Sequence, residues 1–186
     1  MEAFWMSLAT VGLAEVGDRS MFLALLLGLR KQRLVPIFLG MSLGVTANLA
    51  VAGMIGMVLF SWFEGSWHQW LMGLVFIGMG IWMLMPEKED EVQGISAQGA
   101  FWAAAVLFFI SEMADKTQLA VVALAGNFQA FFPVVLGGAL GLLLVTGPAL
   151  WFGNRFAERL PIKLIQRMGA VLFFGFGLFV LAQAAS

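Results

Sequence analysis

Glu15-Val-Gly-Asp18-Arg19-Ser20 and Glu112-Met-Ala-Asp115-Lys116-Thr117 are two forms of one charged hexapeptide, and each lies inside a long apolar stretch. The 186-residue chain is 61% hydrophobic and 11% charged, whereas soluble domains carry roughly 25% charged residues. Because a membrane-spanning helix needs about 20 mostly apolar residues, this composition predicts an all-α polytopic membrane protein with about six transmembrane helices. The predicted spans lie near residues 4–29, 34–61, 67–85, 100–125, 131–152 and 164–183.

The second half of the sequence repeats the first with a shift of 97 residues and no gap. The shift superposes Glu15 on Glu112 and Asp18 on Asp115, and it aligns several glycines of the predicted spans. Each copy holds three spans, and because three is odd, the second copy enters the membrane from the opposite side. The sequence therefore predicts two inverted three-helix repeats joined by an acidic cytoplasmic linker, at 1–86, 100–186 and 87–99 respectively.

Basic residues are distributed unevenly over the predicted connections. Two of the ten, Arg19 and Lys116, lie within predicted spans. The others lie in or beside the first, third and fifth connections, and they are Arg30, Lys31, Arg33, Lys88, Arg155, Arg159, Lys163 and Arg167. Because Lys and Arg collect in cytoplasmic loops, these three connections are predicted to face the cytoplasm and both termini to face outward.

The composition also limits the partners and the chemistry. With no cysteine and one histidine, thiolate and multi-histidine metal sites are excluded, so a bound metal has to be held by oxygen. A net charge of -1 gives no indication of a nucleic-acid partner. The expected surroundings are a lipid bilayer and divalent cations, with no prosthetic group, and the oligomeric state is left open.

The two hexapeptides are the candidate site. On a continuous helix Glu15, Asp18 and Arg19 would share one face, and so would their equivalents in the second copy. Each charge at the centre of a bilayer costs roughly 2.5–3.5 kcal/mol, so the six are expected to face one another or a water-filled cavity. Four carboxylates and two cations sum to -2 if all are ionised, which one divalent cation or two protons neutralise. Metal and protons should therefore compete for the same oxygens, as in a cation/proton exchanger.

Several neutral polar residues could complete the site. Gln118, Ser20 and Thr117 lie beside the acids and add oxygen donors that suit Mn²⁺, Ca²⁺ or Mg²⁺. Asn48 has Val145 as its repeat partner, and it is interpreted either as site lining or as a helix–helix hydrogen bond. The glycine at position 17 could permit local unwinding that frees backbone carbonyls. Because Ala114 takes its place in the second copy, the unwinding is predicted to be asymmetric.

Three other interpretations remain open at this stage. The acids and bases could form structural ion pairs four residues apart along each helix. An intramembrane enzyme could use Mg²⁺ on the acids and Arg19 or Lys116 on a lipid phosphate, although the sequence has no glycine-rich phosphate loop. A divalent cation channel would need a continuous pore.

At these hexapeptides the chain resembles the Gdt-type cation/proton exchangers, once filed as uncharacterised protein family sixteen, with the signature Glu-x-Gly-Asp-(Lys/Arg)-(Ser/Thr). That family includes bacterial manganese exporters and eukaryotic Golgi calcium/manganese exchangers, and the resemblance covers nearly the whole chain. It implies metal coordination by Glu15, Asp18, Glu112 and Asp115, with charge balance from Arg19 and Lys116. It also implies export of Mn²⁺, with Ca²⁺ as a second cargo, in exchange for protons across a bacterial inner membrane. The chain departs from the family signature at Ala114, and Met21 stands where the second copy has Gln118.

Overall fold

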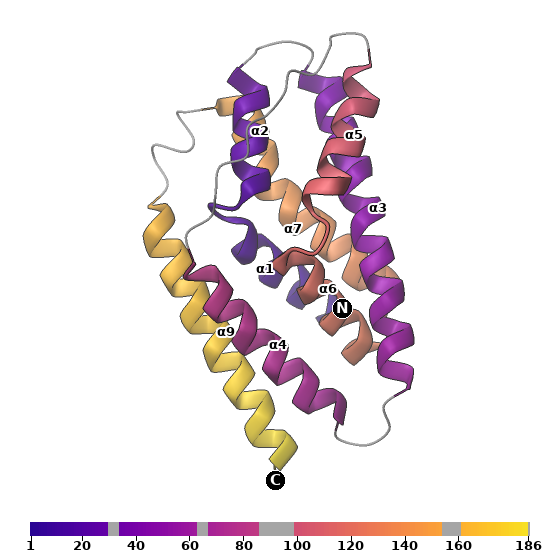
Figure 1. The fold of residues 1–186 in the computed structure, drawn as a ribbon, viewed down its shortest axis with the longest axis vertical. Helices are drawn as coiled ribbons and strands as arrows, with labels where there is room; N and C mark the ends of the chain where they lie inside the picture. The colour runs from indigo at the N-terminus through magenta and orange to yellow at the C-terminus, as the bar shows by residue number, and fades with distance from the viewer. Residues whose placement is uncertain (30–33, 63–66, 86–98, 154–160, 186) are drawn as a thin grey trace.

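The computed structural model describes residues 1–29, 34–62, 67–85, 99–153 and 161–185. Within these ranges all regular structure is helical, and the helices run in the order shown in Figure 1. The first half contains α1 (Glu2–Glu15), α2 (Arg19–Leu29), α3 (Leu34–Ser61) and α4 (Trp67–Met83). The second half contains α5 (Ala100–Ser111), α6 (Lys116–Phe128), α7 (Phe131–Phe152) and α9 (Ile162–Ala185).

Three of the described helices, α3, α7 and α9, are long and apolar enough to cross a membrane. The described part of the chain is thus all-helical, and these helices fit the predicted multi-pass membrane protein. The six-span inverted topology remains a prediction. The linker at 87–99, except for Gly99, and most of the basic connection residues lie outside the described residues.

The predicted spans at 4–29 and 100–125 are not continuous helices, and this corrects the sequence-based expectation. Each is divided into two half-helices, α1 with α2 and α5 with α6, and the break coincides with the charged hexapeptide. In apolar surroundings a break in a helix leaves backbone groups without their usual partners. Such a break is tolerated where the surrounding protein satisfies those groups.

Each long helix packs against the broken helix of the other half (Figure 1). α7 contacts α1 and α2, while α3 contacts α5 and α6. The peripheral helices α4 and α9 pack along one another. The contacts of α7 with α1 and α2 are equivalent to the contacts of α3 with α5 and α6, the matching helices of the other half. The duplication seen in the sequence therefore extends to this packing.

Glycines allow these helices to approach closely. A Cβ at Gly40 or Gly44 of α3 would collide with backbone carbonyls of α5. The equivalent glycines of α7, Gly137 and Gly141, face backbone carbonyls of α1 in the same way. The two Gly-x-x-x-Gly pairs therefore let the helix backbones approach closely, which is the usual role of small residues one turn apart in membrane helices.

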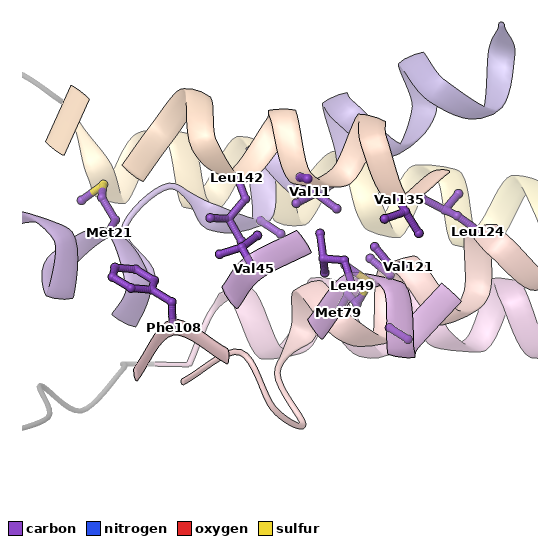
Figure 2. Packing of buried hydrophobic residues seen from close by; sticks show 14 of the residues in the cluster. Val11, Met21, Val45, Leu49, Met79, Phe108, Val121, Leu124, Val135 and Leu142 are labelled. Carbon is purple, nitrogen blue, oxygen red and sulfur yellow. The ribbon is translucent and has the colours of Figure 1, made fainter. Parts of the chain in front are cut away.

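Buried apolar residues from both halves pack together in one cluster (Figure 2). It includes Val11 of α1, Leu49 of α3, Val121 of α6 and Leu142 of α7, all 0% exposed. Met21 and Phe108, also 0% exposed, come from the segments next to the two breaks. Because this cluster excludes water, charges placed beside it interact more strongly with one another than they would in solvent.

Candidate cation site at two helix breaks

The first break follows Glu15, the last residue of α1. Gly17 has a φ of 78°, in the left-handed region that glycine adopts without steric cost. α2 then begins at Arg19, and Asp18 accepts a hydrogen bond of 2.8 Å from the Arg19 backbone N–H. The prediction that Glu15, Asp18 and Arg19 share one helix face is wrong, because the helix ends between them.

The second break has the same form. Ala114 has a φ of 57°, and α6 begins immediately after Asp115. The predicted asymmetry is therefore wrong as well, since both copies are unwound at the equivalent residue. A left-handed conformation costs an alanine roughly 1–2 kcal/mol, because its Cβ crowds the following carbonyl oxygen. The second break thus carries strain that glycine avoids in the first.

Both aspartates lie at the N-terminal ends of half-helices, Asp18 at α2 and Asp115 at α6. The helix macrodipole favours negative charge at such an end. The two carboxyl groups also lie within hydrogen-bonding reach of each other. The breaks therefore bring the aspartates of the two halves together, each at the N-terminal end of a half-helix.

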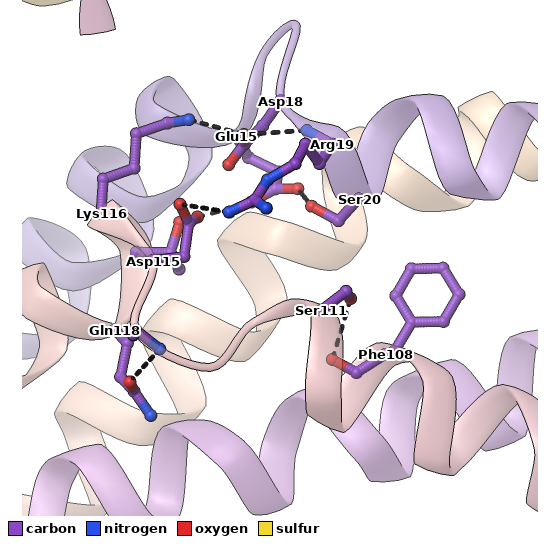
Figure 3. A network of polar contacts seen from close by, with 11 residues as sticks. Glu15, Asp18, Arg19, Ser20, Phe108, Ser111, Asp115, Lys116 and Gln118 are labelled. Atoms are coloured by element: carbon purple, nitrogen blue, oxygen red, sulfur yellow. Dashed lines mark hydrogen bonds and ion pairs between the residues drawn. The ribbon is translucent and has the colours of Figure 1, made fainter. Parts of the chain in front are cut away.

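The ion pairs of the site run between the two halves (Figure 3). Lys116 Nζ lies 2.6 Å from Asp18 Oδ1, and Arg19 Nη2 lies 3.7 Å from Asp115 Oδ1. Arg19 and Lys116 are repeat equivalents, so these two pairs are exchanged when the halves are exchanged. They join the start of α2 to the start of α6. They are therefore not the ion pairs four residues apart along one helix that were considered from the sequence.

Hydroxyl groups contact the two glutamates. Ser20 donates a hydrogen bond to Glu15 Oε1, and Thr117 of the other half donates one of 3.4 Å to Glu15 Oε2. Ser20 also lies within hydrogen-bonding reach of Glu112. Glu112 Oε2 is buried and has no hydrogen-bond partner among the described residues. One glutamate oxygen is thus available to a ligand.

The site is buried, with one exception. The four acids are 0–3% exposed and Lys116 is 2% exposed, whereas the Arg19 side chain is 39% exposed. In the described part of the chain, no three His, Asp or Glu side chains converge closely enough to form a ready-made metal site. In the described structure the four predicted ligands therefore lie near one another without converging on one point.

Gln118 and Asn48 form part of the site's support. The Ala114 backbone N–H donates to Gln118 Oε1 at 2.7 Å, and Gln118 Nε2 donates to Asn48 Oδ1 at 3.2 Å. Asn48 Nδ2 then donates to the Phe109 carbonyl of α5 at 2.9 Å. The helix–helix hydrogen bond considered for Asn48 is thus present.

One contact at the first break was missed by the sequence interpretation. Gln166 of α9 donates a hydrogen bond of 3.3 Å from Nε2 to the Gly17 carbonyl. The available signal was an amide side chain next to Arg167, near the start of the predicted sixth span. It was not singled out because the partner at position 17 is a backbone group.

Broken helices that bring buried charges of two related halves together are characteristic of secondary transporters. Comparison with known proteins agrees with that class. The family model described as "Divalent cation/proton antiporter GDT1" matches residues 3–91 and 100–186. The chain therefore belongs to this family, which consists of transporters and not of enzymes.

Three relatives illustrate the range of the family. A Vibrio cholerae protein named "Putative manganese exporter" is 35% identical and aligns with 93% of this chain and 87% of its own length. The Saccharomyces cerevisiae protein named "Divalent cation/proton antiporter GDT1" is 21% identical, over 99% of this chain and 85% of its own. The Arabidopsis thaliana "GDT1-like protein 4" is 24% identical, over 96% and 94%. No solved structure matches the chain significantly.

Proposed function

We propose that this protein exports Mn²⁺, with Ca²⁺ as a second cargo, in exchange for protons. Glu15, Asp18, Glu112 and Asp115 bind the cation and the protons alternately. The observation that carries the proposal is the meeting of these four buried carboxylates with the two cations Arg19 and Lys116 at two helix breaks. Membership of a divalent cation/proton antiporter family supports it.

Charge balance explains why the two cargoes exclude each other. With all groups ionised the site has a surplus of two negative charges, which one divalent cation or two protons cancel. Carboxylates crowded in poorly solvated surroundings resist joint ionisation, so the empty and ionised site is the unfavourable state. Exchange follows, because the site leaves each side of the membrane carrying either metal or protons.

The side-chain contacts indicate how the acids change partners. Binding of a metal by both aspartates requires Lys116 and Arg19 to loosen their ion pairs, which cross between the halves. A hydroxyl such as Ser20 or Thr117 donates to an ionised carboxylate and accepts from a protonated one. These hydroxyls therefore stabilise the glutamates in both protonation states.

Oxygen ligands determine the class of cargo. Carboxylate and hydroxyl oxygens suit Mn²⁺, Ca²⁺ and Mg²⁺ better than they suit copper or zinc. The name of the Vibrio cholerae relative favours manganese among these.

The unequal exposure of the two cations supports alternating access. A guanidinium facing hydrocarbon would cost roughly 2.5–3.5 kcal/mol, so the exposed Arg19 marks the side on which the site meets water. If the two halves rock against each other during transport, the state that opens to the other side of the membrane exchanges the environments of Arg19 and Lys116. Lys116 would then be the exposed cation and Arg19 the buried one.

Flux measurements with purified protein in liposomes test the proposal. An imposed pH gradient should drive Mn²⁺ movement, and Glu15→Gln and Glu112→Gln should each reduce it at least about tenfold, as loss of metal-site groups commonly does. Glu2→Gln, at an exposed acid of the first helical turn, should leave the flux unchanged.

Competition of Ca²⁺ and Mg²⁺ with Mn²⁺ in the same assay ranks the three cations as cargoes. Electrical currents above carrier rates would identify a channel, and full flux through both variants would exclude these glutamates as carriers of the exchange.

The proposed setting is a bacterial inner membrane, with two inverted three-helix repeats at 1–86 and 100–186. The 87–99 linker faces the cytoplasm and both termini face outward, as the placement of basic residues favours. Because the chain has no cysteine, single introduced cysteines report their location cleanly. In intact cells a membrane-impermeant maleimide should label Ser186→Cys and should not label Gln93→Cys until the cells are opened. The reverse pattern would invert the topology.

A further inference from the structure

The two helix breaks are equivalent in form but are stabilised by different residues. The first has Gly17 with a φ of 78°, and the second has Ala114 with a φ of 57°. Glycine adopts this conformation freely, whereas alanine does so only when its surroundings compensate.

The compensation at the second break is a chain of hydrogen bonds. The strained Ala114 donates its N–H to Gln118, and Gln118 donates to Asn48. Asn48 is anchored on the Phe109 carbonyl, so the chain connects α6 through α3 back to α5. Both sides of the break are thereby tied to one helix of the opposite half.

The first break has no equivalent of this chain. The repeat shift places Met21 at the position of Gln118 and Val145 at the position of Asn48. Met21 is 0% exposed and Val145 packs against the apolar core. The two halves therefore differ at all three of these equivalent positions. The break with glycine is accompanied by two apolar side chains, and the break with alanine by two amide side chains.

We propose that Gln118 and Asn48 are positioning residues that hold the Ala114 break in shape, and that neither is a ligand of the transported cation. Their amide oxygens, the atoms that would coordinate a metal, accept N–H donors instead. The break that they hold joins Glu112 to Asp115, so their removal displaces two of the proposed ligands. The effect on transport rests on the proposed function, whereas the effect on the fold does not.

A double-mutant cycle between Gln118 and Ala114 tests this inference on the purified full-length protein. Gln118→Met, which installs the side chain of the first half, should lower the cation-free thermal midpoint by about 2–4 °C. It should also raise the KM for Mn²⁺ roughly tenfold, as the loss of a supporting contact does at metal sites. Ala114→Gly should rescue both values, because glycine does not need the support. Asn48→Val should behave as Gln118→Met does, and Gln69→Met, at a glutamine of α4, is the matched control without effect.

The outcomes separate positioning from ligation. If Gln118 were a cation ligand, Gln118→Met would leave the cation-free midpoint unchanged and would raise KM by the same factor with or without Ala114→Gly. That result would overturn the inference. If the wild-type protein moves no Mn²⁺, the proposed function fails. The midpoints of the cycle then still decide whether Gln118 supports Ala114.

Discussion

Asp18→Asn is expected to abolish exchange and also to destabilise the folded protein, whereas Asp115→Asn abolishes exchange with a much smaller loss of stability. Both acids are proposed ligands, so the loss of either carboxylate should stop transport. The stability effects differ because the partners differ in exposure. The Lys116 side chain is 3% exposed and lies 2.6 Å from Asp18, while that of Arg19 is 39% exposed and lies 3.7 Å from Asp115.

The size of the difference follows from the burial of the ion pair that is broken. Removal of one partner of a buried ion pair costs about 3–5 kcal/mol. Loss of an exposed ion pair costs roughly 0.2–1 kcal/mol. Chemical or thermal unfolding of the two purified variants, measured side by side, gives both values.

A second substitution separates folding from function. Replacement of both members of a buried pair by residues of similar volume is often neutral, so Asp18→Asn with Lys116→Met should recover the wild-type midpoint. It should not recover Mn²⁺ flux, because the carboxylate is still missing. Equal destabilisation by the two single variants would contradict the buried Lys116–Asp18 pair. Transport by the double variant would remove Asp18 from the mechanism.

Gly44→Ala and Gly141→Ala are expected to destabilise the protein by about 1–3 kcal/mol each, the usual cost of an added methyl group in a packed interior. The new Cβ would collide with the Ala105 carbonyl in the first case and the Leu8 carbonyl in the second. Backbone atoms cannot move aside as a flexible side chain can. The long helix must therefore move away from the broken helix that carries the acids, and transport should fall with stability.

The matched controls are Gly78→Ala and Gly175→Ala, which are also repeat equivalents. A Cβ at either position meets no atom within 4 Å. Because alanine favours a helix over glycine by up to about 1 kcal/mol, these variants should be neutral or slightly more stable. The expected change in stability therefore has opposite signs in the two pairs of substitutions. Destabilisation of the same size in both pairs would show that close backbone approach is not the reason why both halves have glycine at the positions of Gly44 and Gly141.

The sequence alone was enough to predict the class of protein and its duplication. The apolar composition indicates a membrane protein, and the charged hexapeptides inside apolar stretches have to be enclosed by its helices. The shift of 97 residues relates the two halves without a gap. It was also enough to nominate Glu15, Asp18, Glu112 and Asp115, because charged residues inside apolar spans are costly wherever they have no partner. The close approach at Gly44 and Gly141 was likewise predictable from local spacing.

Tertiary structure decided what local patterns could not. Periodicity placed Glu15 and Arg19 on one helix face, but the surrounding helices support a break there, and the cations pair across the halves. The sequence suggested that Ala114 would resist unwinding, yet Gln118 and Asn48, from two separate helices, support its left-handed backbone. The composition of one segment fixes how costly its buried charges and strained residues are. Which distant groups compensate that cost depends on how the two halves pack together, and only the folded arrangement determines it.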